Sequence, residues 1–407
     1  HCSRDPRAHH KEKHKLVLKT LMKKVLLIGI RGTYNYGCEA IVRGTTVLLE
    51  KNIPKIEVYY ASYNYADDRK RLEGCNVHLI NRKPSFIHRV VRKGLSILGI
   101  KYNMPYDRLS WVKKYRFDAV FSIGGDIYTL DAQKNYNPSL PLFCEKLQAL
   151  GLKYILWGAS IGPFTENPEA EDFFKNHLKR TDLIVCREEN TQEYLKRLGI
   201  EKNVVLAPDP AFSVPDPFPA AKEADKTHIG INLSPLSSLY FYKDLEEAAK
   251  QQAHIVTGII KKYNTDIYLL PHVLSPISTN DNDLHFLEKI YENIPEKHKN
   301  RVTLVKTDPG FIGLKRYIKQ CKTVIAARMH CAINALSCGI PAVFLSYSEK
   351  SKGLSKYAYG TDKYAIKLSN AKSLDGLDLL HMPEIKMAFP EGREKDIFGK
   401  LQNLLKK

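Results

Sequence analysis

Hydrophobic residues occur along this chain in short runs that alternate with longer amphipathic stretches. Several runs in the first half, such as KVLLIGI and DAVFSI, are apolar throughout, which is typical of parallel strands covered by helices on both faces. Strands are predicted at 24–30, 56–61, 76–80, 118–123, 153–158, 182–186 and 203–207. Helical periodicity lies between them, at 38–51, 86–98, 139–150, 168–180 and 190–198. This half therefore predicts a doubly wound α/β domain, with Asn190 or Thr191 capping its last helix.

A proline-rich segment interrupts the alternation. Residues 208–219 contain five prolines within twelve positions, which excludes a continuous helix or a central strand. Beyond it the pattern resumes, with strands predicted at 228–234, 266–272, 301–305, 323–327 and 341–346. The helices of this half are predicted near 243–262, 281–293, 310–320, 330–338 and 393–405.

These patterns predict an α/β fold of two doubly wound, Rossmann-like domains that face each other across a cleft. The expected divisions are an N-terminal domain at 22–212, a linker at 213–226, a C-terminal domain at 227–385, and a segment at 386–407 whose helix could return to the N-terminal domain. Ligands of such folds bind at the carboxyl ends of the strands. The residues that directly follow each strand are therefore the candidates for function.

The charge balance adds a possible class of partner. The chain has 407 residues, of which 63 are Lys or Arg and 44 are Asp or Glu, for a net charge of +19. We interpret residues 1–21 as a leader or a cloning remnant, because Met22 opens MKKVLLIGI like a natural start. The remaining excess predicts a solvated basic surface, a small anionic substrate or an anionic membrane surface. No basic run interleaved with aromatic residues supports nucleic-acid binding, so nucleic acid is not an expected partner.

The eight cysteines are scattered and show no spaced pairs. This pattern favours neither a disulfide framework nor a zinc site, and it fits a reducing cytoplasm. No metal site is expected, and no uninterrupted apolar stretch reaches the roughly 18 residues of a membrane-spanning helix. We therefore expect a cytoplasmic protein.

Three loops of the first half carry candidate chemistry. The loop GIRGTYNYG leads into a helix and contains Asn35, and its backbone amides could bind an anion or a hydroxyl, or could form only a tight turn. After the strand at 118–123, Gly124 and Gly125 would let a ligand approach the backbone closely. The carboxylate of Asp126 would accept hydrogen bonds from an acceptor hydroxyl, or would cap the next helix.

An arginine follows the buried strand at 182–186. Arg187 is expected to bind an anion, with an ion pair to Glu188 or Glu189 as the alternative.

In the second half, the strand at 323–327 is followed by Arg328 and His330 immediately before a helix. A guanidinium beside an imidazole at a helix start would bind an anion next to a proton-transfer group. Lys350 follows the next strand, so we expect Arg328, His330 and Lys350 to converge. His272, in the loop PHVLSP after the strand residues 266–270, is either a buried structural histidine or a substrate contact.

The set GGD, GASIGP, CREENT, PDPAF, LLPHV and above all ARMHCAINALSCGIPAVFLSYSEKSKG resembles the polysaccharide pyruvyl transferase family, over residues 24–353. The resemblance implies a fold like that of the GT-B glycosyltransferases, with phosphoenolpyruvate as donor substrate, a sugar diol as acceptor, and no further cofactor. It implies donor binding and catalysis by Arg187, Arg328, His330 and Lys350. Many members have three glycines where this chain reads GGD, which leaves the role of Asp126 open.

The chemistry of phosphoenolpyruvate agrees with that set, because a carboxylate and a phosphate need several fixed cations. The expected acceptor is a precursor of a surface or capsular polysaccharide. If that precursor is lipid-linked, the basic surface would let the enzyme work at the inner face of the membrane. Two alternatives remain, a glycosyltransferase of the same fold that uses a nucleotide sugar, and a non-enzymatic binder of an anionic glycan.

Overall fold

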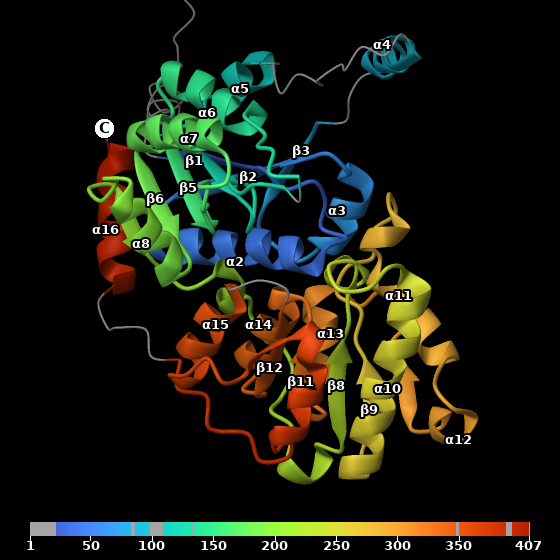
Figure 1. The fold of residues 1–407 in the computed structure, drawn as a ribbon. Helices are drawn as coiled ribbons and strands as arrows, with labels where there is room; N and C mark the ends of the chain where they lie inside the picture. Colours follow the sequence, from blue (N-terminus) through green and yellow to red (C-terminus); the bar gives the residue numbers. More distant parts are fainter. Residues whose placement is uncertain are drawn as a thin grey trace, which may run out of the picture.

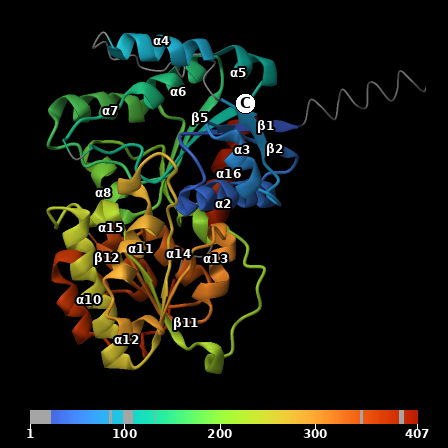
Figure 2. The same ribbon diagram turned by 90° about the vertical axis from the view of Figure 1, so that its right-hand side faces the viewer.

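The computed structural model describes residues 22–82, 86–97, 109–131, 133–346, 350–387 and 393–406, and every structural statement below concerns these residues. They form two parallel sheets with helices on both faces of each, as the sequence pattern predicts. Figures 1 and 2 show the two α/β units one above the other, with helix α2 (Tyr36–Asn52) at the boundary between them. Among the described helices, none is both long and apolar enough to cross a membrane.

The first sheet has seven strands in the order β3-β2-β1-β4-β5-β6-β7, and all neighbours are parallel. The strands are β1 (Lys23–Ile28), β2 (Ile56–Ser62), β3 (His78–Asn81), β4 (Ala119–Ile123), β5 (Lys153–Ala159), β6 (Leu183–Cys186) and β7 (Val204–Leu206). The helices after α2 are α3 (Tyr65–Arg71), α4 (Phe86–Ile97), α5 (Leu109–Tyr115), α6 (Ser139–Ala149), α7 (Pro168–Arg180) and α8 (Glu189–Arg197).

Strand β1 shows why its sequence is apolar throughout. Successive side chains point to opposite faces of a strand. Val25 and Leu27 pack with α2 on one face, whereas Leu26 and Ile28 pack with α6 on the other, and all four are buried. A strand covered on both faces leaves no polar position, which explains the continuous run VLLI.

The second sheet has six parallel strands in the order β10-β9-β8-β11-β12-β13. They are β8 (His228–Asn232), β9 (Asp266–Leu269), β10 (Val302–Leu304), β11 (Cys321–Ala326), β12 (Ala342–Ser346) and β13 (Ala365–Lys367). Its helices are α9 (Pro235–Ser238), α10 (Leu245–Tyr263), α11 (Asp283–Glu292), α12 (Glu296–Lys299), α13 (Gly310–Ile318), α14 (Met329–Ser337) and α15 (Lys350–Tyr359). Short 3-10 helices occur at η1 (Pro210–Ser213), η2 (Glu223–Asp225), η3 (Thr279–Asp281) and η4 (Leu368–Gly376).

The last helix, α16 (Arg393–Lys406), packs against the first sheet and not the second. Ile397, Phe398 and Leu401 are buried in the core that also contains β1, and the Phe398 ring lies 5.8 Å from the Trp157 ring. Figure 1 shows this helix in red beside α8. Lys51 of α2 pairs with Glu394 at 3.0 Å, so the end of the chain is held to the N-terminal unit.

Several local predictions were incomplete. The pattern did not indicate α3, α5 or α15, because short and strongly polar stretches such as YADDRKR show no clear apolar period. The predicted cap of α8 was wrong, since Glu188 occupies the N-cap and Thr191 lies inside the helix, where its hydroxyl accepts a hydrogen bond from the Ile161 amide. The cysteines that the structure describes are all free thiols.

Helix α2 joins the two units through close backbone contacts. The Tyr36 amide donates to the His272 carbonyl at 3.0 Å, and the Leu274 amide donates to the Tyr34 carbonyl at 3.0 Å. Midway along α2, a Cβ built on Gly44 would lie 1.9 Å from the Pro210 carbonyl oxygen. Only a glycine allows the helix and η1 to approach this closely.

We predict that Gly44→Ala destabilises the protein by about 1 to 3 kcal/mol, because backbone atoms at such a contact can move little. The measurement is the free energy of unfolding from a denaturant titration. Gly258→Ala on α10 is the matched control, since a Cβ there meets nothing within 4 Å. Ala at that exposed helical position should be neutral or stabilising by up to about 1 kcal/mol. Equal effects of the two changes would contradict the prediction.

Candidate active site

A cleft of about 1150 Å³ lies between the two units and is lined by loops that follow strands of both sheets. It brings together all the site residues predicted from the sequence except Lys350, namely Asn35, Gly124, Gly125, Asp126, Arg187, His272, Arg328 and His330. Lys350 is the first residue of α15, and its side chain lies outside the described part of the structure. The convergence expected from the parallel sheets is therefore present for the other predicted residues.

Arg187 is buried at the floor of this cleft, with 3% of its side chain exposed. Its Nε donates to Ser160 Oγ at 3.0 Å and its Nη1 donates to Asp209 Oδ2 at 2.8 Å. A Cβ built on Gly125 would lie 2.7 Å from Nη1, so this glycine makes room for the guanidinium. The alternative partners Glu188 and Glu189 were wrong, because the carboxylates beside Arg187 belong to Asp209 and Asp126.

One nitrogen of this guanidinium is only weakly engaged. Arg187 Nη2 is buried and makes no hydrogen bond to any described residue, and its ion pair to Asp126 Oδ1 is long, at 3.5 Å. Asp126 is half-exposed and precedes no helix, which rules out the capping role considered for it. Arg187 therefore keeps a donor for a ligand in the cleft.

Asp209 is the central carboxylate of the site, and the sequence analysis assigned it no role. Its Oδ1 accepts from the Ala211 amide at 2.9 Å, while its Oδ2 accepts from Arg187 and lies 3.3 Å from His330 Nε2. Burial alone would raise the pKa of Asp209, but the charges of His330 and Arg187 and the Ala211 amide hold it well below its ordinary value of 3.8. The motif PDPAF contained the signal, because an Asp between prolines has a fixed backbone.

His330 lies in the first turn of α14, one residue further into the helix than predicted. Its Nε2 faces Asp209, although the angle between them does not meet hydrogen-bond geometry. On the other side of the ring, a Cβ built on Gly37 would lie 2.5 Å from Nδ1. A histidine of the C-terminal unit is thus enclosed by α2 and by the carboxylate that holds Arg187.

Arg328 is the N-cap residue of α14 and is also held by carboxylates. Its Nη2 donates to Asp281 Oδ1 at 2.7 Å and to Asp283 Oδ1 at 2.8 Å, and its Nε donates to Asp283 Oδ1 at 3.1 Å. Burial raises the pKa of Asp283, although Arg328 opposes that shift. The sequence predicted a cation available to an anionic ligand, whereas the structure shows one that already has two acidic partners.

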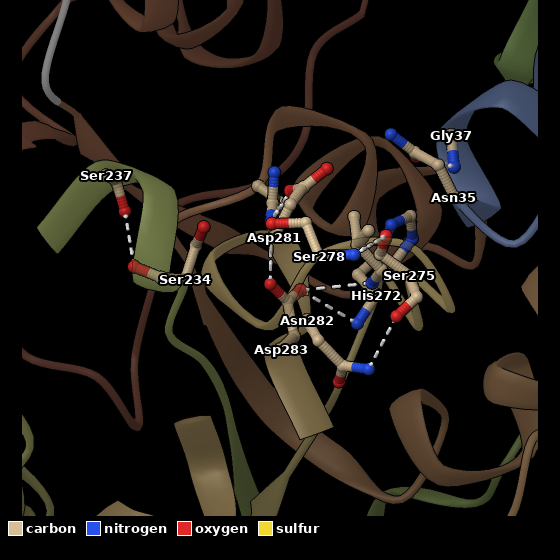
Figure 3. Close-up of polar contacts among 12 residues, drawn as sticks. Asn35, Gly37, Ser234, Ser237, His272, Ser275, Ser278, Asp281, Asn282 and Asp283 are labelled. Atoms are coloured by element: carbon tan, nitrogen blue, oxygen red, sulfur yellow. Dashed lines mark hydrogen bonds and ion pairs between the residues drawn. The ribbon is translucent and has the colours of Figure 1, made fainter. Parts of the chain in front are cut away.

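His272 and Asn35 meet at the junction of the two units, where Figure 3 shows the loop with His272 and Asp283 facing the start of α2. Asn35 caps α2, since its side chain accepts from the Gly37 amide at 2.9 Å. Burial, reinforced by His330 and Arg328, holds the pKa of His272 well below its ordinary value, so the ring is neutral. Its Nε2 is buried with no hydrogen-bond partner among the described residues, so His272 has one polar atom left for a ligand.

Two further lining residues were missed. Arg31 of the loop GIRG is exposed at the cleft, and no hydrogen bond or ion pair of its side chain is present within the described residues. Ser234 lines the cleft from the second sheet, and its buried hydroxyl makes no hydrogen bond there. The sequence analysis singled out the loop of Arg31 for its backbone amides and not for this side chain, and it gave no signal for Ser234. No group of three or more His, Cys, Asp or Glu residues in the described ranges could hold a metal ion.

Comparisons with known proteins identify relatives over most of the chain. The family model for polysaccharide pyruvyl transferase matches residues 35–349. The amylovoran biosynthesis protein AmsJ of Erwinia amylovora is 24% identical over 368 residues, which cover 82% of this chain and 85% of that protein.

Among solved structures, the UDP-GlcNAc 2-epimerase of Neisseria meningitidis bound to UDP-GlcNAc aligns with a TM-score of 0.58, at 12% identity, over 95% of this chain and all of that one. A putative UDP-N-acetylglucosamine 2-epimerase of Listeria monocytogenes aligns with a TM-score of 0.57, at 16% identity, over 95% of this chain and 97% of that one. At these identities the alignments show a common GT-B-like fold and nothing about the reaction.

The depressed pKa of Asp209 gives a prediction with a defined pH dependence. Asp209→Asn should lower the free energy of unfolding at pH 7 by about 1.5 to 3 kcal/mol, because Arg187 loses its charged partner. A carboxylate whose pKa is lowered by folding stabilises the folded state at pH values above its ordinary pKa of 3.8. This stabilisation is lost as the pH falls below that value. The free energies of unfolding of wild type and variant should therefore become more similar below pH 3.8.

Denaturant titrations at several pH values measure this difference. Asp172→Asn, at an exposed position of α7, is the control, and its free energy of unfolding should equal that of the wild type at every pH. A difference for Asp209→Asn that stays constant down to pH 3 would show that its charge does not stabilise the fold.

Proposed function

The chain belongs to the polysaccharide pyruvyl transferase family, and from this premise we propose that it transfers a pyruvyl group from phosphoenolpyruvate to a sugar diol. The product is a pyruvate ketal on a precursor of a surface or capsular polysaccharide. The observation that carries the proposal is the contact of Asp209 with both Arg187 and His330. It joins an anion-binding guanidinium and a proton-transfer group in one cleft.

The donor would bind to guanidinium groups that have N–H groups available for hydrogen bonds to a ligand. Arg187 Nη2 is buried without a hydrogen bond to the described residues, and Arg31 is exposed on the cleft wall. Arg328 is oriented by Asp281 and Asp283, and a guanidinium with five N–H groups can serve those carboxylates and a phosphate together. Lys350 remains in the proposed donor site on the family resemblance alone.

The reaction requires balanced proton transfers. In the proposed sequence, protonated His330 gives its proton to the methylene carbon of the donor, which creates an oxocarbenium-like centre at the neighbouring carbon. One sugar hydroxyl adds there, inorganic phosphate leaves, and the second hydroxyl adds to close the ketal. Of the two protons that the hydroxyls lose, one restores His330 and the other ends on the departing phosphate, either directly or relayed by Asp126. Asp209, ionised between Arg187 and His330, would stabilise the imidazolium.

The acceptor is proposed to be a saccharide, and a lipid-linked precursor would place the enzyme at the inner face of the membrane as a peripheral, cytoplasmic protein. The name of AmsJ refers to biosynthesis of the polysaccharide amylovoran, which agrees with such an acceptor. No metal or additional cofactor takes part in the proposed chemistry.

We predict that the protein releases phosphate from phosphoenolpyruvate only when a suitable saccharide acceptor is present, because hydroxyl addition completes the exchange. The measurement is a phosphate assay with donor alone, with acceptor alone and with both. Phosphoenolpyruvate should also raise the unfolding temperature, since a ligand that binds the native state stabilises it. Stabilisation and turnover with nucleotide sugars, with phosphoenolpyruvate inert, would instead identify a glycosyltransferase. Binding of an anionic glycan without any turnover would identify a binding protein.

His330→Gln separates catalysis from binding. The variant should lose about 100-fold to 10,000-fold in kcat, the usual contribution of general acid catalysis. Its affinity for phosphoenolpyruvate should stay within a few-fold, because the guanidinium groups remain. His254→Gln on the exposed face of α10 is the control and should retain wild-type turnover. Near-normal turnover of His330→Gln, with intact folding, would contradict the assigned role.

A further inference from the structure

Helix α4 carries apolar residues that the rest of the described structure does not cover. Ile87, Val90, Val91 and Ile97 are 70%, 52%, 42% and 80% exposed, respectively. In both views α4 lies on the side of the N-terminal unit that faces away from the C-terminal unit (Figures 1 and 2). Four large apolar residues exposed on one short helix are a feature of interaction surfaces and not of ordinary solvated helices.

The spacing of the sequence divides α4 into two sides. Residues 87, 90, 91, 94 and 97 follow the i, i+3, i+4, i+7, i+10 pattern of one helical face, and they read Ile, Val, Val, Gly and Ile. Arg89 and Arg92 fall on the opposite side of the helical wheel, and Lys93 falls at the border between the two sides. Around the helix, residues 82–101 contain six Lys or Arg and no Asp or Glu. The segment is therefore both amphipathic and uniformly basic.

We propose that α4 binds the surface of an anionic lipid membrane, with its apolar face in the acyl boundary and its basic side among the lipid headgroups. An apolar face opposite a Lys- and Arg-rich face is the pattern of helices that lie in the membrane interface. Its twelve residues give a length of about 18 Å, which is too short to span a bilayer. A second copy of the same chain is a poor occupant, because two uniformly basic segments would repel each other.

The chain that leads to α4 leaves the first sheet at the edge that lines the cleft. All strands of the first sheet are parallel, so β3 ends at the same edge as the strands that supply Asp126 and Arg187. Arg82 directly follows β3, and its guanidinium lies over the rings of Tyr63 and Phe143 at 5.6 and 5.4 Å. Helix α4 begins four residues later, within about 14 Å of extended chain.

Membrane-bound α4 would therefore keep that edge of the sheet close to the lipid surface. A peripheral membrane contact is part of the proposed function, and membrane binding by α4 rests on that function for its purpose. It is tested by lipid binding and not by turnover, so that either proposal can fail alone.

The experiment is sedimentation of the full chain with vesicles of phosphatidylcholine alone or mixed with phosphatidylglycerol. The wild type should bind the mixed vesicles and lose that binding at high salt. Arg92→Gln with Lys93→Gln should weaken binding roughly 25-fold, since each basic residue near such a surface contributes about fivefold. Ile87→Ser with Ile97→Ser should weaken it as well, through loss of apolar contact.

The matched controls are Lys261→Gln on α10 and Ile277→Ser, which change an exposed lysine and an isoleucine that is 78% exposed in the other unit. Both should bind like the wild type, and all variants share residues 1–21, so the comparison isolates α4. Three results would overturn the proposal: no binding of the wild type to the mixed vesicles, equal binding by the α4 variants, or self-association in solution that Ile87→Ser abolishes.

Discussion

The carboxylate of Asp209 is the constraint on which the site depends, because it contacts an arginine from one half of the molecule and a histidine from the other. Arg187 follows a strand of the first sheet, His330 lies in the first turn of a helix of the second, and Asp209 lies on the chain between the two sheets. Buried charges are tolerated only when they are paired, and removing one partner leaves the other exposed to the full desolvation cost. The relative position of the two sheets and the charge state of the cleft are therefore coupled.

The same coupling explains the glycines of the site. Gly37 lies against His330, Gly125 lies against the guanidinium of Arg187, and a Cβ at either would overlap the side chain it faces. Glycine is required at these two positions because the facing side chains lie close to the backbone, and not because the backbone must be flexible. Arg328 follows the same principle with Asp281 and Asp283, so both principal arginines are oriented before any ligand arrives. Fixed donors cost no reorganisation during a reaction, which is what a site for a multiply charged donor needs.

Much of this architecture could be predicted from the sequence, for identifiable reasons. Strands such as β1 and β4 are apolar on both faces, so their runs are unmistakable, and the parallel sheets place the residues after them in one cleft. Arg187, Arg328 and His330 were found because each lies within four residues after the end of such a strand. Asp209 was not, because it follows the short strand β7 in a proline-rich segment, and its motif PDPAF entered only the family resemblance, with no role for the carboxylate. The partners of the arginines were missed because pairing of Arg187 with Asp209, or of Arg328 with Asp281, depends on loop conformation that no periodicity encodes.

A crystal structure with phosphoenolpyruvate bound tests the central claim most directly, since the claim is that one donor contacts both halves of the molecule at the Asp209 cluster. We expect donor oxygens within hydrogen-bond distance of Arg187 Nη2 and the methylene carbon beside His330, with Asp209 still between the two side chains. A donor bound by only one unit, or held away from Arg187 and His330, would contradict the account.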